Sequence, residues 1–399
     1  MNFSKINLRN NKPLIAWTLS LLLISIFIVK ANYVARENDS RLYSRFTAQL
    51  NSKPLSQFLA LEWRDYSWYA ETETPYVRDH LTGQFILPVL LAKLGYSEKH
   101  SIYFVNSFYK ALSLFFIFLI ACKYFPRNIS ALMTILVQIT PVSLNYQMRA
   151  NHEPALLLLV LMAIYGVVKL NENKKYLLLI LFSIQFCFLI KGIAFLPIIP
   201  VIFAIYFLTN RPIKISQCST LVLISSSVLL TALVYELVFK KLTHVSFFEQ
   251  YIKVQLLGRS FSEESSSIPL LGNIKAFGYY FSRLLSYSLP WSLVAIIIMV
   301  KNKFSLSITK RERNFYYSLL SAALIYVLTF SISSRTASRY IYPSYFLVSS
   351  VCIMFILNNF KEKLSAKETR FHIISAITFL ILTSISIFKA IGNEALYPH

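Results

Sequence analysis

Few residues in this sequence could carry out chemistry, and they lie far apart. The only three aspartates are Asp39, Asp65 and Asp79, and His80 directly follows the last of them. Carboxylate and imidazole groups can take a proton from an attacking hydroxyl group, and they can also bind a metal ion. Because all three aspartates fall in one segment, 32–102, that segment is the first candidate for part of an active site.

A second set of polar residues interrupts or ends long apolar runs. It consists of Arg149, Glu153, Lys191, Arg335 and Arg339. Charged groups at membrane depth are costly and are usually retained for a function. Lys and Arg at the ends of apolar runs can also extend towards lipid headgroups. A structural role therefore stays open for Lys191, Arg335 and Arg339.

The composition indicates the environment that these residues share. Of the 399 residues, 56% are hydrophobic and 15% are charged, and the mean hydropathy is +0.54; soluble proteins carry roughly 25% charged residues. Apolar runs long enough to cross a bilayer recur throughout, and only helices satisfy their own backbone there. We predict an all-α polytopic membrane protein, a single integral membrane domain over 1–399. About eleven transmembrane helices are expected, at roughly 14–31, 103–122, 128–146, 154–170, 176–190, 192–208, 218–239, 286–300, 315–333, 340–358 and 371–389.

Basic residues indicate how the helices are oriented. The formal net charge is +22, but no basic tract has the aromatic interleaving of a nucleic-acid groove, so nucleic acid is not expected as a partner. Short connections on one side are all basic, with Lys123/Arg127, Lys174/Lys175, Arg211/Lys214 and the clusters within 301–313 and 361–370. The positive-inside rule makes that side, and the N-terminus, cytoplasmic. The two long connections, 32–102 and 240–285, are then periplasmic loops of a bacterial inner-membrane protein.

The first loop contains two stretches with helical periodicity. Leu42, Phe46 and Leu50 recur every four residues, and a second apolar stretch runs from Phe85 to Leu94. This spacing predicts amphipathic juxtamembrane helices that lie on the membrane surface. The four cysteines show neither metal-ligand spacing nor a disulfide framework, and we interpret them as small core residues.

Carboxylates and cations at the outer interface fit one reaction in particular. When a sugar leaves a polyprenyl phosphate, negative charge develops on the phosphate, and Arg or Lys side chains can stabilise it. An acceptor hydroxyl group that attacks the sugar needs a carboxylate to orient it or take its proton. The same set of residues would also fit a transporter.

Short motifs at these positions resemble a known family, the GT-C glycosyltransferases, in the bacterial branch similar to protein O-mannosyltransferases and aminoarabinose transferases. The family's Asp-Glu-x-x-Tyr motif resembles Asp39-Ser40-Arg41-Leu42-Tyr43, with Ser40 in place of the second acid. In the family's order there follow Asp79-His80, Arg149-Ala150-Asn151-His152-Glu153, Lys191-Gly192, Pro290-Trp291 and Arg339-Tyr340. The prolines that the family has after the second motif are missing, and Glu153 stands where the family has aspartate.

The resemblance implies transfer of a sugar from a polyprenyl-phosphate donor to a lipid, glycan or protein acceptor at the periplasmic face. The expected catalytic residues are Asp39, as base, and Glu153. The expected donor-phosphate ligands are Lys191, Arg339, Arg335 and Arg149. The expected substrate-binding residues are Asp79, His80, Tyr43 and Tyr340. The resemblance fixes no cofactor: Ser40 weakens a paired-carboxylate metal site, and a divalent metal stays open.

Two other interpretations of the sequence remain. One is a membrane transporter or flippase of lipid-linked glycans, for which Lys110, inside an apolar run, is the favouring residue; a packing role for Lys110 is the simpler interpretation. The other is a glycan polymerase or ligase that uses lipid pyrophosphate donors. Inverted repeats, which are typical of transporters, are not detectable in the sequence.

Overall fold

The computed structural model describes residues 38–63, 74–146, 149–210, 212–253, 269–301, 309–332, 336–360 and 368–395. Within these ranges the regular elements are helices joined by turns and short irregular segments, and the one other feature is an isolated β-bridge between Glu62 and Tyr76. The predicted all-α fold is therefore confirmed. The predicted first span, 14–31, lies outside the described residues, as do Asp65 and Arg335.

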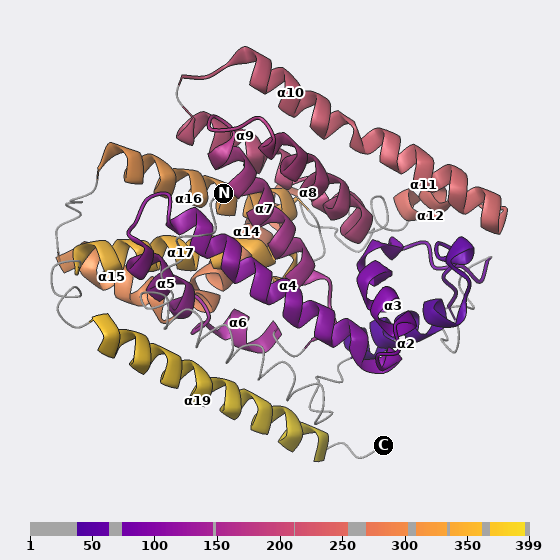
Figure 1. Ribbon diagram of the computed structural model, residues 1–399, viewed down its shortest axis with the longest axis horizontal. Coiled ribbons are helices and arrows are strands. Elements are labelled where there is room, and N and C mark those ends of the chain that lie inside the picture. Colours follow the sequence, from indigo (N-terminus) through magenta and orange to yellow (C-terminus); the bar gives the residue numbers. More distant parts are fainter. Residues whose placement is uncertain are drawn as a thin grey trace.

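A bundle of packed helices forms the core (Figure 1). Its members are α4 (Glu98–Ala121), α5 (Arg127–Leu136), α7 (Glu153–Lys169), α8 (Tyr176–Lys191), α9 (Ile198–Thr209), α16 (Lys310–Ser331) and α17 (Tyr342–Asn359). Among the most buried of them are α7 and α17; in α17, Tyr345, Phe346 and Met354 are almost inaccessible to solvent. The four cysteines are free, and Cys187 is buried in this core, as their interpretation as core residues requires.

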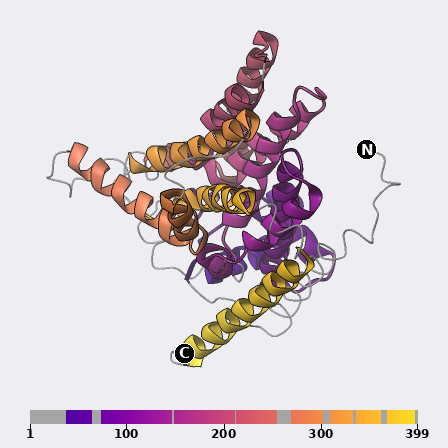
Figure 2. The ribbon, with the colours of Figure 1, turned by 90° about the vertical axis from the view of Figure 1, so that its left-hand side faces the viewer.

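Other helices lie at the edges of the bundle. Along one side run α10 (Ile215–Ser226) and α11 (Val228–Thr243), and along the opposite side runs α19 (Glu368–Ala395) (Figures 1 and 2). Many apolar side chains of α10 and α11, such as Leu223 and Leu229, are exposed. Exposed apolar faces of this size are expected where helices contact lipid.

The helices agree with most predicted spans in position. In the described part of the chain, four helical segments are long and apolar enough to cross a membrane: Glu98–Ala121, Ile215–Thr243, Lys310–Ser331 and Ser338–Asn359. A fifth is counted if α14 (Pro269–Tyr287) and α15 (Trp291–Lys301), which meet at a 90° bend, form one span. The number of about eleven therefore stays a prediction.

Two predicted boundaries differ from the structure. The single run expected at 128–146 is divided into α5 and α6 (Pro141–Tyr146), because Pro141 cannot continue a helix and instead begins a new one. The expected second loop, 240–285, contains α12 (Phe247–Tyr251) and the first part of α14 (Pro269–Tyr287). The periodicity of α14 follows an amphipathic face, so a search for purely apolar runs underestimates its length.

The two predicted amphipathic helices of the first loop are present as α2 (Asn38–Ser52) and α3 (Ile86–Lys93), which follows the short η5 (Thr82–Phe85). The apolar face of α2 contacts protein: Leu42, Phe46 and Leu50 are buried in a cluster that includes Phe85. For α2 the expectation of a lipid contact is corrected, because the chain after α2 folds back and supplies the apolar partner. In α3, Leu87 and Leu90 are exposed, as is Leu94 directly after it, so a contact of this helix with the membrane surface stays a prediction.

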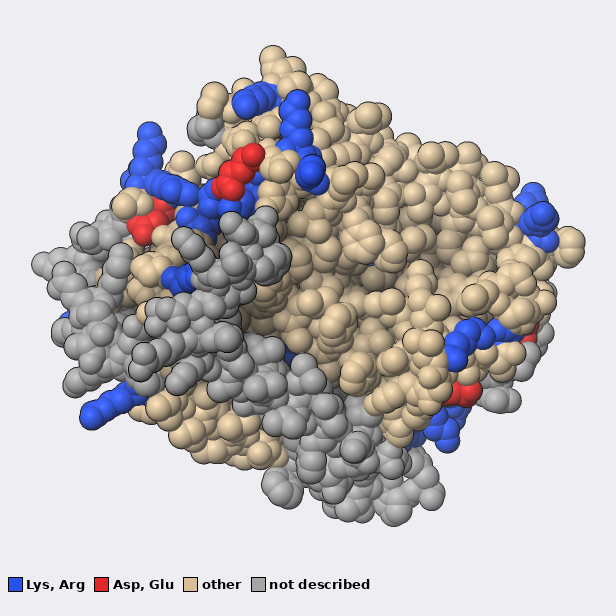
Figure 3. Space-filling view, viewed as in Figure 1, with Lys and Arg blue, Asp and Glu red and all other residues tan. Residues whose placement is uncertain are grey.

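Charged side chains gather towards two ends of the molecule, separated by a broad band of other residues (Figure 3). At the end remote from α2, Glu172 forms ion pairs with Lys123 and with Lys169, and Arg311 donates a hydrogen bond to the Lys123 carbonyl. We call Lys123, Lys169, Glu172 and Arg311 the basic end. Three of the connections predicted as cytoplasmic meet there, as the predicted topology requires.

Candidate active site

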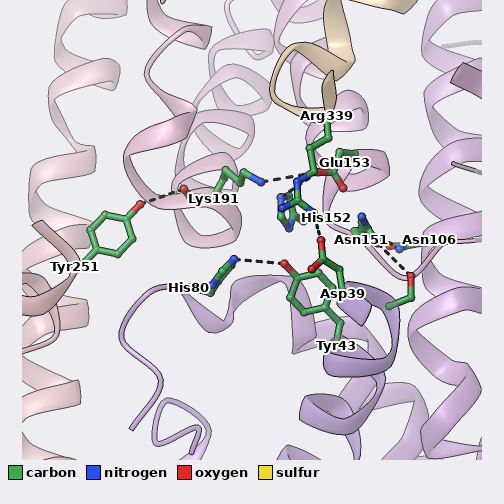
Figure 4. A network of polar contacts seen from close by, with 11 residues as sticks. Asp39, Tyr43, His80, Asn106, Asn151, His152, Glu153, Lys191, Tyr251 and Arg339 are labelled. Atoms are coloured by element: carbon green, nitrogen blue, oxygen red, sulfur yellow. Dashed lines mark hydrogen bonds and ion pairs between the residues drawn. The ribbon is translucent and has the colours of Figure 1, made fainter. Parts of the chain in front are cut away.

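At the other end, two carboxylate–cation pairs lie close together (Figure 4). The first pair joins Asp39, in the first turn of α2, to Arg339, in the short η8 (Ser338–Ile341) that precedes α17. The two residues are 300 positions apart in the sequence. Both side chains are partly exposed, Asp39 by 37% and Arg339 by 29%. A ligand can therefore reach this pair from solvent.

The segment that carries Arg339 is fixed by two tyrosines. The Tyr345 hydroxyl donates to the Ser338 carbonyl over 2.7 Å, and the Ala337 amide donates to the Tyr280 hydroxyl over 3.3 Å. Tyr280 belongs to α14 and Tyr345 to α17. The backbone that carries Arg339 is therefore held by contacts with two helices, α14 and α17.

The second pair joins Glu153, at the start of α7, to Lys191, the last residue of α8. The Glu153 side chain is fully buried, and its Oε1 lies 3.9 Å from Lys191 Nζ and 3.3 Å from His152 Nε2. A buried carboxylate is costly unless cations and hydrogen-bond donors surround it. Pro154 occupies the first turn of α7, where its missing N–H costs no hydrogen bond and its fixed φ favours the helix.

Lys191 is positioned by a close backbone contact. Gly192 ends α8 with φ +57°, and a Cβ at this position would overlap the Tyr251 hydroxyl. That hydroxyl accepts a hydrogen bond from the Ile193 amide at 3.0 Å and donates one to the Lys191 carbonyl at 3.3 Å. Only glycine fits this conformation and this contact. The Lys-Gly motif thus has a structural reason, and the second long loop supplies it through Tyr251.

Residue Tyr340 links the two pairs. Lys191 Nζ lies 5.9 Å from the centre of the Tyr340 ring, within the range of a cation–π interaction. The preceding residue, Arg339, contacts Asp39. The short η8 thereby contributes Arg339 to the first pair and places Tyr340 beside Lys191 of the second pair. A ligand that contacts Arg339 therefore also lies near Lys191.

A third group of predicted residues borders the same space. The Tyr43 hydroxyl lies 3.3 Å from His80 Nε2, and His80 Nδ1 lies 3.0 Å from Asp79 Oδ1. The edge of the Tyr43 ring faces the His152 ring, with 5.9 Å between the centroids. The chain of contacts Asp79–His80–Tyr43–His152–Glu153 therefore runs from the first loop to the second pair.

The serine that replaces the family's second acid has a structural role. The Ser40 hydroxyl is fully buried; it donates to Asn151 Oδ1 at 3.2 Å and accepts from the Ala150 amide at 3.0 Å. The Asn106 side chain, from α4, donates to the carbonyls of Asn151 at 2.6 Å and of Arg149 at 3.1 Å. This junction ties α2, α4 and the start of α7 together and so sets the spacing between Asp39 and Glu153.

Arg149 lies beside the pairs rather than within them. Its guanidinium group lies 4.9 Å from the centre of the Tyr146 ring, and Tyr146 packs on Tyr342 at the start of α17. Arg335 cannot be compared, since it lies outside the described residues. The structure thus brings together Asp39, Tyr43, Asp79, His80, Glu153, Lys191, Arg339 and Tyr340, with Arg149 at the margin.

Two residues of the site were not predicted. His152 is nearly inaccessible, and its place beside Glu153 in the quoted motif was the available signal. Tyr251 carries no such signal, because nothing in its neighbouring sequence indicates a contact with Lys191. Within the described ranges no group of three or more His, Cys, Asp or Glu side chains could hold a metal ion.

Lys110, the residue that favoured a transporter, has a packing role. It is buried within α4, and its Nζ donates a hydrogen bond of 2.9 Å to the carbonyl of Ser143 in α6. A buried amine can be accommodated when it satisfies an otherwise unpaired backbone carbonyl. Lys110 therefore joins α4 to α6, as the simpler interpretation of the sequence expected.

Comparison with known proteins gives a consistent result. Residues 83–239 match the family model described as dolichyl-phosphate-mannose-protein mannosyltransferase. This region contains Glu153 and Lys191, while Asp39 and Arg339 lie outside it. A comparison with curated protein sequences finds no significant match.

Two solved structures share the fold. The crystal structure of ArnT from Cupriavidus metallidurans bound to undecaprenyl phosphate superposes with a TM-score of 0.62 at 10% identity, covering 96% of this chain and 75% of that one. The archaeal oligosaccharyltransferase AglB from Archaeoglobus fulgidus, in complex with an inhibitory peptide and a dolichol-phosphate, gives a TM-score of 0.53 at 12% identity. That match covers 96% of this chain and 56% of the other. The protein thus has the polytopic membrane fold of the GT-C glycosyltransferases, with a central region that matches the dolichyl-phosphate-mannose-protein mannosyltransferase family.

Proposed function

We propose that this protein transfers a sugar from a polyprenyl-phosphate donor to a lipid, glycan or protein acceptor at the periplasmic face of a bacterial inner membrane. The observation that carries the proposal is the pair of carboxylate–cation contacts, Asp39–Arg339 and Glu153–Lys191, joined through η8. Residues so far apart in the sequence would meet in this way if the site had to hold an anionic ligand next to a base. The two solved relatives contain polyprenyl phosphates.

The cations suit the change in charge during the reaction. The donor is a phosphodiester with one negative charge, and the departing polyprenyl phosphate carries up to two. Arg339 and Lys191 are both positioned before the bond breaks, so they would stabilise the developing charge without reorganisation. Tyr340, between them, would bring an aromatic face against the sugar or the isoprene chain.

Asp39 is the proposed base. The acceptor hydroxyl oxygen forms a bond to the anomeric carbon while the bond from that carbon to the phosphate oxygen breaks, which inverts the configuration. The hydroxyl proton passes to Asp39. Without the donor, Asp39 is paired with Arg339, and when the phosphate draws Arg339 away, Asp39 becomes the stronger base. Base activation would therefore follow donor binding.

The remaining residues have supporting roles in this proposal. Glu153 would orient the substrate through Lys191. The group formed by Tyr43, His80 and Asp79, which is partly exposed, would hydrogen-bond the sugar or the acceptor. The basic end lies opposite the site, so the positive-inside rule favours a site outside the cytoplasm. A lipid-linked donor would approach with its tail in the bilayer and its phosphate at that interface.

A labelling experiment tests the proposal. The purified protein in lipid vesicles is incubated with a radiolabelled polyprenyl-monophosphate sugar and membrane extract, and the labelled fraction is identified. We expect label to appear in a lipid, glycan or protein fraction, and to be lost for Asp39→Asn. Glu172→Gln, at the basic end, is the matched control with unchanged labelling. Near-normal labelling by well-folded Asp39→Asn contradicts the assignment of the base.

Further arms of the same experiment separate the rivals. Label transferred only from a lipid pyrophosphate oligosaccharide would indicate a polymerase or ligase instead. Movement of the intact labelled lipid across the vesicle membrane without transfer would indicate a flippase. Transfer that persists after thorough chelation removes a divalent metal from the mechanism, and transfer restored by one added metal identifies it.

A further inference from the structure

Arg78 is a buried cation that the proposed reaction does not use. It lies in the first loop, directly before the Asp79–His80 pair, and only 8% of its surface is exposed. Its Nη1 donates a hydrogen bond of 3.0 Å to the carbonyl of Ser246, which lies 168 residues later. A guanidinium group is costly to bury, and a charge-assisted hydrogen bond offsets part of that cost. The contact therefore joins the two loops that are predicted to be periplasmic.

The carbonyl that Arg78 contacts belongs to the residue directly before α12. Ser246 is the N-cap of this helix, which has only five residues. At the same end, Glu236 of α11 accepts hydrogen bonds from the amides of Phe247 and Phe248, at 3.1 and 3.0 Å. A helix this short is not stable alone, because it makes too few internal hydrogen bonds. The position of α12 therefore depends on the side chains that contact it, and Arg78 is one of them.

The opposite end of α12 contacts the turn that ends α8 (Figure 4). Tyr251, the last residue of α12, donates a hydrogen bond to the Lys191 carbonyl at 3.3 Å and accepts one from the Ile193 amide at 3.0 Å. The Tyr251 ring stacks on the ring of Phe247, with 5.6 Å between the centroids. The two ends of α12 are therefore packed together, and a shift at its start would reach the backbone of Lys191.

A second contact joins the same part of the first loop to the end of α8. Leu81 is fully buried, and its Cδ1 lies 2.9 Å from the position that a Cβ on Gly192 would occupy. Arg78 and Leu81 flank the Asp79–His80 pair, so the residues on both sides of this pair contact either α12 or the end of α8. The contacts of this stretch therefore bear on two sides of the candidate site at once.

We propose that Arg78 is a positioning residue for the donor-phosphate site. By holding α12 in place, it keeps Tyr251 against the backbone of Lys191, and so fixes the point from which the Lys191 side chain reaches a phosphate. Arg78 touches no substrate in this scheme. The proposal rests on the proposed function, in which Lys191 binds the donor. Coupling between two sites is reciprocal, so donor binding at Lys191 should in turn stabilise α12.

A direct attraction between the Arg78 charge and the phosphate is the competing explanation. Such an attraction would not involve α12, so its effect on affinity would multiply with that of any change at Tyr251. Positioning through α12 predicts a different result, because Arg78 and Tyr251 then maintain the same contact. Once one of them is lost, losing the other should matter little. A double-mutant cycle between the two residues therefore distinguishes the explanations.

The experiment measures the dissociation constant of methyl farnesyl phosphate, a phosphodiester with an isoprenoid chain, for the full-length protein in lipid nanodiscs. Arg78→Gln and Tyr251→Phe should each raise this constant by about 3- to 30-fold. The double variant should bind no more than about twofold more weakly than the weaker single variant. An unchanged constant in Arg78→Gln, or a double variant whose factor equals the product of the two single factors, overturns the proposal.

The matched control is Arg311→Gln. Arg311 also donates to a backbone carbonyl, but it lies at the basic end, so its loss should change the dissociation constant by less than about twofold. A change in Arg311→Gln as large as that in Arg78→Gln would show that the loss of any such arginine weakens binding, and it would overturn the assignment of Arg78.

A second measurement uses the wild type alone and needs no change at position 78. Amide hydrogen exchange is followed with and without the probe. Because the coupling is reciprocal, the probe should slow exchange in α12 and at Ile193, and it should leave residues 169–175 at the basic end unchanged. Protection that stops at the end of α8 and does not reach α12 contradicts the role of Arg78 but leaves the proposed function intact. If the wild type does not bind the probe at all, both proposals fail.

Discussion

The two ends of the molecule use the same kinds of side chain in different ways. At the basic end Glu172 is 46% exposed, and one of its two partners, Lys169, is only three residues away. At the site, Glu153 is fully buried and Asp39 pairs with a residue 300 positions away. Positive charges are in excess at the basic end. Burial and the neighbouring Lys169 and Arg311 lower the pKa of Lys123 there.

This difference distinguishes charges that would orient the protein in the membrane from charges that would take part in the proposed reaction. Exposed ion pairs contribute little to stability, because water and salt screen them. A buried carboxylate costs free energy even when it is paired, so a hydrophobic pair would be at least as stable. In the predicted topology, the basic end needs only the sign of its charge, which would direct insertion. The site needs individual atoms at defined positions, and this is the reason for expecting unequal effects of matching substitutions.

The largest difference should appear between two arginines. Arg339→Gln removes the proposed donor-phosphate ligand and the partner of Asp39, so kcat/KM should fall by about 100- to 1,000-fold. Arg311→Gln, at the basic end, loses one hydrogen bond to a carbonyl and a cation–π contact with Tyr124, and its kcat/KM should change less than about twofold. The labelling assay measures both. Equal losses would show that the comparison between the two ends is wrong.

Restoring the family's second acid should damage the junction rather than improve the site. Ser40→Glu places a carboxylate in a fully buried position that fits only a hydroxyl group, and we expect a loss of about 3–5 kcal/mol in the free energy of unfolding. Ser40→Ala should lose about 1–2 kcal/mol. Unfolding in mixed micelles provides the measurement. An unchanged or more stable Ser40→Glu protein with metal-dependent activity would mean that the position belongs to a metal site.

Two glycines with positive φ offer a matched pair. Gly95 has φ +95° and open space where a Cβ would lie, whereas Gly192 has φ +57° and contacts Tyr251. Gly95→Ala should therefore cost about 1–2 kcal/mol, from backbone strain alone. Gly192→Ala should cost more, about 2–3 kcal/mol, and should also lower activity because Lys191 shifts. The double variant Gly192→Ala/Tyr251→Ala lacks the whole ring that the new Cβ would meet. If it is no more stable than the sum of the two single changes predicts, the contact with Tyr251 is not the cause.

The smallest effect is expected at the basic end itself. Glu172→Gln removes the acceptor shared by Lys123 and Lys169, and it should change the free energy of unfolding by less than about 1 kcal/mol. Activity should be unchanged. A glycosylation-site tag in the outer loop would report any inverted chains. A large loss of stability in Glu172→Gln would show that charges at the basic end are not merely exposed ion pairs, and the comparison between the two ends would then fail.

Sequence patterns predicted the positions of the helices better than their contacts. The fourfold spacing of Leu42, Phe46 and Leu50 predicted α2, because periodicity reports which face of a helix is apolar. It could not report whether that face meets lipid or protein, since both are apolar surroundings. The division of 128–146 and the start of α14 were missed for a related reason: local turns and amphipathic faces interrupt the hydropathy signal.

The site shows the same limit. Asp39, Glu153, Lys191 and Arg339 were selected because they lie at the same ends of predicted spans in the order of the family's motifs. Which residues pair with which depends on helix packing, and no local pattern encodes it. Tyr251 contacts Lys191 only because α12 packs on the end of α8. The roles of these residues remain predictions that the experiments above decide.

The distance in sequence between Asp39 and Arg339 also has a consequence for synthesis. Asp39 is made early, but its partner follows 300 residues later. At about 5–20 residues per second, that interval lasts roughly 15–60 s. During this time the growing chain already exposes a carboxylate to the membrane surface without the cation that completes the site. In the proposed mechanism, transfer by a partly made chain would thereby be prevented, and a truncated product that stops before η8 would be inserted but inert.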